Sequence, residues 1–374
     1  MYKIKDILNQ VIYGDTRKIL QKIPNDSIDC CITSPPYWGQ RDYGTEPQIW
    51  DEDKNCQHEW GYQIISKLRT GVGPSADVGS NINECQPRKI NQGCYCKFCD
   101  AWNGSLGLEP AFELYLKHLW QIFDEVKRVL KKTGTLWVNI GDTYAGMKVG
   151  NTQGVYANRI DKSKSYANTN SFIKPKSSVS DKCLCQIPSR FSIGMTDKGW
   201  ILRNEIIWYK KNSMPSSAKD RFTVDFEKLF FFVKNKKYYF ETQYEPFDVN
   251  STRWGGNIMK VPKNRKQQQG LSEALSSEER PWRNSRGRNK RCVWDIPTRP
   301  LKKAHLAVFP PKLCITPIKA GCPQGGVILD LFAGSGTVGV VAKELGRNYI
   351  LIDLSPEYCK MAEKRLLNTT GSLF

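Results

Sequence analysis

The sequence predicts an α/β protein built on a mostly parallel sheet, and three observations support this fold class. An amphipathic helical pattern over residues 112–130 is followed by an apolar strand pattern over residues 135–142. Near the C-terminus, an apolar strand over residues 327–331 leads through a glycine-rich turn into a helix and then a second strand that ends at Asp353. The 374 residues are enough for one large domain or two ordinary ones with an ample core.

Two short strands are expected near the N-terminus. VIYGD, at residues 11–15, is typical of a strand that ends in Gly-Asp, and SIDCCITS, at residues 27–34, of a buried strand. Pro35 and Pro36 cannot continue that strand, so the chain must leave it through a rigid turn that presents Tyr37 and Trp38. Taken alone, such a turn could also simply pack its aromatic side chains into a core.

The helix over residues 112–130 carries one apolar stripe at three- and four-residue spacing. Glu109 and Pro110 suit its first turn, and Lys131, Lys132 and Gly134 suit its end. Further strands are expected within residues 199–211 and 228–240. The stripe consists of Phe112, Leu116, Leu119, Phe123, Val126 and Leu130.

The charge balance favours a polyanionic partner. There are 56 Lys and Arg against 37 Asp and Glu, a formal net charge of +19, which points to nucleic acid before an anionic membrane surface. Neither a long apolar run nor a signal-peptide pattern is present, so we expect no membrane partner and a cytoplasmic location in a bacterial, archaeal or phage-infected cell. The 13 cysteines are then expected to be reduced thiols or metal ligands.

Two long segments lack the periodicity of regular structure. Residues 145–182 are rich in Ser, Asn, Lys and Gly, and predict a mobile loop. Residues 251–303 hold 14 Lys or Arg but 4 Asp or Glu, with Trp254, Trp282 and Trp294 interleaved. Basic residues alternating with aromatic ones favour a nucleic-acid contact region, although a solvated basic loop has the same composition.

Residues 51–105 have the composition of an insertion, because they are polar, irregular and rich in cysteine. Cys56-x-His58 and Cys96-x-x-Cys99 would supply four ligands in two tight pairs, as a closed structural zinc site requires. Cys85 or Cys94 could replace one of them, and scattered reduced thiols are the alternative. We do not expect this polar stretch to form a core of its own, so a metal ion is a reasonable source of its stability.

The glycine-rich turn near the C-terminus has the pattern of a nucleotide-binding unit. Gly334, Gly336 and Gly339 form a GxGxxG between a strand and a helix, and Ser355 caps a further helix. The glycines allow the backbone to approach a ligand closely, and Asp353, at the end of the second strand, can accept hydrogen bonds from ribose hydroxyls. By itself the pattern leaves NAD, FAD and S-adenosylmethionine open.

The glycine turn together with the earlier Ser-Pro-Pro-Tyr turn resembles the amino methyltransferases that act on DNA. Because the Pro-Pro turn comes early and FAGSGT comes late, the order is that of their circularly permuted β group, and the resemblance covers most of the chain. It implies a Rossmann-like, S-adenosylmethionine-dependent methyltransferase sheet. CKFCDAWNGSLGLEP is similar to a Cys-x-x-Cys knuckle found in a subset of these enzymes.

The resemblance also implies which residues form the site. The turn that receives a flipped-out base is Ser34, Pro35, Pro36 and Tyr37. Zinc ligands are expected at Cys56, His58, Cys96 and Cys99. Cofactor contacts are expected from Asp15 in VIYGD, from Phe309 and Pro310 in HLAVFPPKL, and from Asp330, Phe332, Gly334, Ser335, Gly336, Thr337 and Asp353.

The predicted chemistry is methyl transfer to an exocyclic amino group. Its nitrogen is a poor nucleophile because the lone pair is delocalised, and rigid acceptors at Ser34 and Pro35 would favour a pyramidal nitrogen. Tyr37 would stack on the extruded base. The Thr-Ser-Pro-Pro-Tyr form is most often the cytosine-N4 type, with adenine-N6 as the alternative. Carbon-5 methylation would need a Pro-Cys dipeptide, which the chain lacks.

More remote alternatives are an RNA or protein amino methyltransferase and a non-catalytic DNA-binding protein. We expect double-stranded DNA as partner, and the family allows a cognate restriction endonuclease and a homodimer. The predicted organisation is a catalytic domain in three parts (residues 1–50, 106–240 and 296–374), a zinc-stapled insertion (51–105) and a basic target-recognition region (241–295).

Overall fold

The computed structural model describes residues 1–68, 88–145, 178–213, 215–216, 218–246, 287–298 and 310–369. The helices are α1 (Ile4–Ile7), α2 (Thr16–Leu20), α3 (Phe112–Val129), α4 (Ile187–Asp197), α5 (Pro311–Gly321), α6 (Thr337–Glu344) and α7 (Pro356–Leu367). The strands of the main sheet are β1 (Gln10–Tyr13), β2 (Ile28–Thr33), β8 (Leu130–Ile140), β9 (Ile201–Tyr209), β10 (Phe226–Val233), β13 (Val293–Asp295), β14 (Val327–Asp330) and β15 (Asn348–Asp353).

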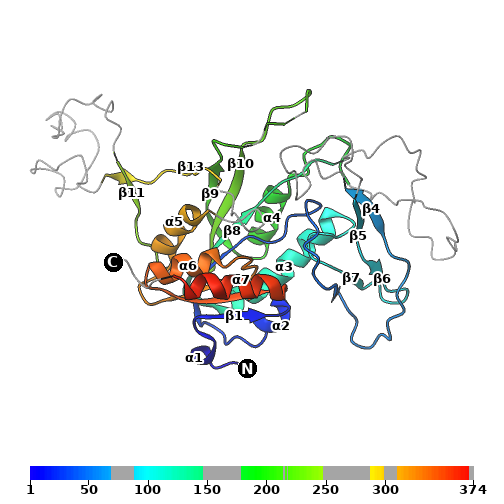
Figure 1. Ribbon diagram of the computed structural model, residues 1–374, viewed down its shortest axis with the longest axis horizontal. Helices are drawn as coiled ribbons and strands as arrows, with labels where there is room; N and C mark the ends of the chain where they lie inside the picture. The colour runs from blue at the N-terminus through cyan, green and yellow to red at the C-terminus, as the bar shows by residue number, and fades with distance from the viewer. Residues whose placement is uncertain are drawn as a thin grey trace, which may run out of the picture. The chain divides into compact units, whose positions relative to one another are not determined.

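The main sheet has the order β1-β15-β14-β2-β8-β10-β9-β13. Figure 1 labels β1, β8, β9, β10 and β13 of this sheet. The run from β1 to β8 is parallel, whereas β10 is antiparallel to both β8 and β9. β14 lies directly beside β2, with Ile328 opposite Cys30 and Leu329 opposite Cys31. Strands that are about 300 residues apart in the sequence therefore end next to each other at the same edge of the sheet.

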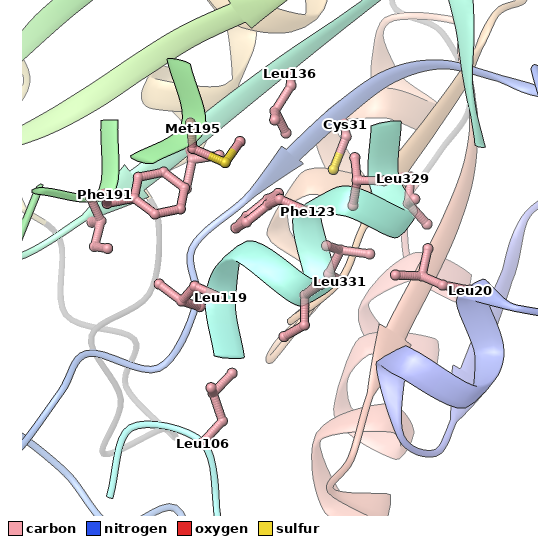
Figure 2. Close-up of a cluster of buried hydrophobic side chains, with 14 of the residues drawn as sticks. Leu20, Cys31, Leu106, Leu119, Phe123, Leu136, Phe191, Met195, Leu329 and Leu331 are labelled. Atoms are coloured by element: carbon pink, nitrogen blue, oxygen red, sulfur yellow. The ribbon is translucent and has the colours of Figure 1, made fainter. Parts of the chain in front are cut away.

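Helices cover both faces of this sheet, and alternate residues of the central strands face different cores. In β2, Cys31 belongs to the cluster formed with α2, α3 and α4, while Cys30 and Ile32 belong to the cluster formed with α5 and α6. Figure 2 shows Leu119 and Phe123 of α3 among buried side chains of the sheet. The two cysteines of β2 are thus core residues, as their position in an apolar strand indicates.

Most predicted elements are confirmed, with two differences. The helical stripe is buried over its whole length, but α3 ends at Val129, and residues 131–134 already belong to β8. β10 ends at Val233, so the apolar residues after it do not extend the strand. Ser355 caps α7 through Tyr358 N, as predicted.

The insertion contributes Trp102 to the main hydrophobic core rather than forming a core of its own among the described residues. β3 (Gln48–Trp50) directly precedes it and pairs with β7 (Trp102–Gly104), and β7 pairs with β6 (Cys94–Tyr95). A two-stranded ladder of β4 (Ile65–Leu68) and β5 (Arg88–Asn91) lies within it. The rings of Trp50 and Trp102 stack on buried His118 of α3, with ring centroids 4.3 and 5.5 Å from that of the histidine. These two tryptophans supply buried apolar area that the polar average composition of the segment does not indicate.

Residues Glu241–Cys292 form a second unit, in which β11 (Tyr244–Glu245) pairs with β12 (Arg288–Asn289). The Glu245 carboxylate pairs there with Arg288 and Arg291 at 2.9 and 2.6 Å. Trp254 and Trp282 lie outside the described residues, as do residues 146–177 of the predicted mobile loop. Among the helices that the structure describes, none has the length and apolar character needed to cross a bilayer.

Candidate active site

A cavity of about 740 Å³ opens where β2 and β14 end side by side. Its lining includes the Pro-Pro turn that follows β2 and the glycine turn that follows β14. The two turns are joined below the cavity, since Thr33 Oγ1 donates a hydrogen bond of 2.8 Å to Asp330 Oδ1. Burial raises the pKa of Asp330 to about 7, although this hydrogen bond and another from Phe332 N act in the opposite direction.

The structure brings most of the predicted site residues together around this cavity. Gly336 and Pro310 are described but are not among the lining residues, and Phe309 lies outside the described residues. The predicted residues that line the cavity are Asp15, Ser34, Pro35, Pro36, Tyr37, Asp330, Phe332, Gly334, Ser335, Thr337 and Asp353.

The glycine turn is bound by the carboxylate of Asp353 at the end of β15. Gly334 and Gly336 have φ angles of 51° and 76°, in the region that favours glycine. Gly334 N donates to Asp353 Oδ2 at 2.7 Å, and Ser355 N donates to Asp353 Oδ1 at 2.8 Å. Burial raises the pKa of Asp353, and these N–H donors oppose the shift. A carboxylate offers about four lone-pair sites, so Asp353 can accept further hydrogen bonds from a ligand.

Arg365 of α7 also fixes the glycine turn, and sequence analysis did not identify it. Its Nη1 donates to Ser335 O at 2.5 Å, to Ser335 Oγ at 2.7 Å and to Thr337 Oγ1 at 3.1 Å. Burial lowers the pKa of this guanidinium. No sequence motif includes this arginine. Its contact with the turn depends on how α7 packs against the turn, which the local sequence does not predict.

The Pro-Pro turn is anchored from several elements. Tyr115 Oη of α3 donates to the Pro36 carbonyl at 2.8 Å, and Trp38 Nε1 donates to the Glu109 carbonyl at 2.8 Å. The turn therefore packs as a rigid unit, and its stiffness keeps Ser34 and Tyr37 at fixed positions in the cavity wall.

Tyr37 is held by polar side chains from strands far away in the sequence. Its hydroxyl lies 2.8 Å from Asn139 Oδ1 and 2.7 Å from Glu227 Oε2, and Lys210 forms an ion pair with Glu227. Burial, and next the charge of Glu227, raise the pKa of Tyr37 well above its usual value, so the phenol stays protonated. Ser34 Oγ donates to this phenol at 3.4 Å, which leaves the serine lone pairs available.

Glu227, Asn139 and Lys210 all line the cavity and were not predicted as site residues. Gly141 was not predicted either, yet a Cβ at this position would come within 2.6 Å of the Tyr37 ring, so the ring packs against glycine backbone. The only sequence signal for the first three of these residues was that they are polar and lie near strand ends. The pairing of β10 with β8 and β9 brings Asn139, Glu227 and Lys210 together near Tyr37.

Two aspartates that follow strands of the main sheet, Asp15 and Asp142, have local structural partners. Asp15 lines the cavity, but it also caps α2 and forms an ion pair with Arg17 at 2.7 Å. Asp142, at the end of the TLWVNIGD segment, is not among the lining residues. Its Oδ1 accepts from Thr143 N and Ile187 N, which fixes the start of α4.

The four predicted metal ligands lie together in the insertion. Ligand atoms of Cys56, His58, Cys96 and Cys99 are all within 4.8 Å of one another. Cys56 Sγ is 3.8 Å from Cys96 Sγ, close to the separation of about 3.8 Å expected between two thiolates on tetrahedral zinc. Cys94 is not part of this group, and Cys85 lies outside the described residues. The donor set is that of a closed site for a soft or borderline metal ion.

The insertion also contributes to the cavity itself. Ser105 at its end is a lining residue, and so are Trp50, Leu106 and Leu108, which flank it in the sequence. The connection that precedes it is tied to the same segment, since Ser105 Oγ donates to the Thr45 carbonyl at 3.0 Å. Part of the cavity wall is therefore formed by residues at or next to the two ends of the insertion in the sequence.

Comparison with known proteins gives consistent matches over nearly the whole chain. A family model described as DNA methylase matches residues 28–364. The Type II methyltransferase M.XycI of Xanthomonas campestris pv. cyanopsidis is 33% identical over 357 residues, covering 94% of this chain and 86% of the relative. The Type II methyltransferase M.SmaI of Serratia marcescens is 32% identical over 358 residues, covering 96% and 90%.

Solved structures show the same fold. The PvuII DNA methyltransferase, described as cytosine-N4-specific, has a TM-score of 0.52 at 16% identity, covering 97% of this chain and 93% of that one. A DNA modification methylase of Thermus thermophilus, described as putative and solved in complex with S-adenosyl-L-methionine, has a TM-score of 0.50 at 17% identity, covering 97% and 96%.

Proposed function

The chain belongs to the β group of DNA amino methyltransferases, and on this premise we propose that it transfers a methyl group from S-adenosylmethionine to N4 of a flipped-out cytosine in double-stranded DNA. The observation that carries the proposal is the cavity shared by the Pro-Pro turn and the glycine turn. A methyl acceptor and a methyl donor could meet there.

The residues present fit the proposed cofactor. The cavity has the size of a small-molecule site. A Cβ at Gly334 would meet nothing within 4 Å, so this wall leaves space beside the backbone. Asp353 would hold ribose hydroxyls, and Phe332, Ser335 and Thr337 would line the same wall. When bound, S-adenosylmethionine supplies the sulfonium methyl group that is transferred.

The other wall accounts for activation of the amino group. Ser34 Oγ has its own proton directed to Tyr37, so its lone pairs can accept from an exocyclic N–H. Glu227 and Asn139 hold the Tyr37 hydroxyl, which leaves the ring as a platform against which the base can stack. These contacts position the base and its nitrogen before reaction.

The preference for cytosine rests on the motif Thr33-Ser34-Pro35-Pro36-Tyr37. Adenine-N6 methylation would use the same fold and the same contacts. A nucleoside digest of DNA incubated with the protein and labelled S-adenosylmethionine separates the two bases. Label in N4-methylcytosine is the expected result, label in N6-methyladenine overturns the assignment of the base, and no label in DNA of varied sequence overturns DNA as the substrate.

We also propose that Cys56, His58, Cys96 and Cys99 bind one structural zinc ion. Metal analysis of the purified protein should find zinc, and a Cys96→Ser/Cys99→Ser double variant should lose both the metal and thermal stability. Cys183→Ser, at an exposed cysteine outside this group, is the matched control. A double variant that lacks zinc but unfolds at the wild-type temperature would contradict the structural role.

The remaining assignments follow from the family. We propose residues 241–295 as the region that reads the target sequence, although residues 247–286 lie outside the described residues. The relatives are named Type II methyltransferases, so a cognate restriction endonuclease is a proposed partner, together with a homodimer and a cytoplasmic location.

A further inference from the structure

The connection from β9 to β10 runs along the rim of the cavity. Asn212 and Ser213 at its start, and Val224 near its end, are lining residues. In Figure 1 this green connection extends well beyond the ends of the two strands. The two ends of this connection therefore contribute to the wall of the cavity that a base would enter.

The connection is tied at its base to another segment. Lys210 N donates to the Asp225 carbonyl at 2.7 Å, which closes the two ends on each other. Asn212 Nδ2 donates to the Thr298 carbonyl at 2.9 Å, and Thr298 N donates back to Asn212 Oδ1 at 2.9 Å. This reciprocal pair fixes the start of the connection.

The outer part is also anchored. Asp220 pairs with Lys182 at 2.8 Å, and the Arg221 guanidinium lies 3.6 Å from the centre of the Tyr144 ring. Two consecutive side chains thus attach the connection to the segments around residues 144 and 182. The next residue, Phe222, is presented from a fixed backbone.

Phe222 is the most exposed aromatic side chain among the exposed hydrophobic residues of the described chain, at 96%. Val224 and Phe226 follow at alternate positions and are 51% and 40% exposed. Two residues of chain span at most about 7 Å, so Phe222 lies close to cavity-lining Val224. A cluster of exposed apolar side chains beside a functional cavity indicates a binding surface.

The surrounding charge indicates what that surface binds. Lys210, Lys211, Lys219 and Arg221 stand against Asp220 and Asp225 in this connection, a local excess of two positive charges, and Lys210 lines the cavity. An aromatic side chain among basic ones suits a ligand with phosphates outside and stacked bases inside. Duplex DNA has that chemistry.

We propose that Phe222 inserts into the duplex at the position that the target base leaves. This inference rests on the proposed function, in which a base enters the cavity. Extruding that base opens an apolar gap in the stack, and an aromatic ring that fills the gap recovers part of the lost stacking. Phe222 would then stabilise the duplex from which the base has been extruded, whereas Tyr37 in the cavity would stack on the extruded base.

The test compares Phe222→Ala with Phe222→Trp, using Tyr62→Ala as the control because Tyr62 is a 74% exposed aromatic residue that is not among the cavity-lining residues. The substrate is a duplex carrying the recognised sequence, found by mapping methylated positions in plasmid DNA. A second duplex places the target opposite an abasic site, where extrusion costs less. Fluorescence of pyrrolocytosine, a cytosine analogue that pairs with guanine, at the target position reports extrusion directly.

Phe222→Ala should methylate the intact duplex at least about tenfold more slowly, with a smaller fluorescence rise, and should recover to within about twofold of wild type on the abasic duplex. Phe222→Trp and Tyr62→Ala should behave like wild type. Equal activity of Phe222→Ala on the intact duplex, or an equal loss on both duplexes, overturns the inference alone. Failure of the wild-type protein to methylate either duplex overturns the proposed function with it.

Discussion

The glycine-turn wall of the cavity (residues 332–337 and Asp353) and the Pro-Pro-turn wall (residues 34–37) are held by different kinds of contact. In the first, main-chain N–H groups of neighbouring residues bind Asp353. In the second, Asn139 and Glu227, from strands far away in the sequence, bind Tyr37. The contacts of Asp353 and Arg365 that hold the glycine-turn wall come from the C-terminal part of the chain, whereas the Pro-Pro-turn wall depends on side chains of β8 and β10.

Tyr37→Ala should give the largest effect and should separate the two walls. Loss of the ring removes the proposed stacking platform, worth a few kcal/mol, so turnover should fall about a hundredfold. Because the glycine-turn wall is independent of this ring, affinity for S-adenosylmethionine should stay within about twofold. Single-turnover rates and a cofactor-binding titration measure the two quantities, and an equal loss in both would refute the separation.

Asp353→Ala should have the opposite effect, with Asp353→Asn as the milder variant. Charge-assisted hydrogen bonds to ribose hydroxyls contribute about 1.5–3 kcal/mol, so cofactor affinity should weaken about ten- to a hundredfold. Turnover at saturating cofactor should change little. If the dissociation constant stays at its wild-type value, the acid at the end of β15 does not bind the cofactor.

Glu227→Gln should have a smaller effect, confined to the Pro-Pro-turn wall. The amide keeps an acceptor for Tyr37 but loses the ion pair with Lys210, and turnover should fall up to about tenfold at unchanged cofactor affinity. Tyr37→Phe, which keeps the ring and removes the hydroxyl, is the matched comparison. A Glu227→Gln enzyme with weakened cofactor binding would show that the walls are coupled.

Asp330 joins the two walls, and its effect should appear in stability rather than in turnover. Its pKa is raised to about 7 in the folded state, so the folded protein binds more protons than the unfolded chain between about pH 4 and pH 7. This residue's contribution to the free energy of unfolding therefore falls as pH rises through that window and levels off above it, with a total change of a few kcal/mol at most. Asp330→Asn should remove this slope in denaturant titrations, and an unchanged slope would contradict the shifted pKa.

The contrast between the walls also explains how far the sequence could predict the site. Gly334, Asp353 and Ser34 to Tyr37 stand in short contiguous motifs at strand ends, and a motif determines its own local geometry. Glu227, Asn139 and Arg365 act through pairing and packing that no local spacing encodes. The fold shows the same limit. Periodicity predicted the strands and helices, but it could not predict that the rings of Trp50 and Trp102 stack on His118.

The stack of Trp50, His118 and Trp102 has a consequence for exchanging parts between related enzymes. Both ends of the cysteine-rich segment hold one histidine of α3, and residues at both ends also line the cavity. A chimera joined at residues 51 and 105 would take Trp102 from one enzyme and Trp50 and His118 from the other. The stack, and the part of the cavity wall beside it, would then combine residues that did not evolve together. When this segment is exchanged between related enzymes, β3, β7 and the first turns of α3 should therefore be taken from the same parent protein.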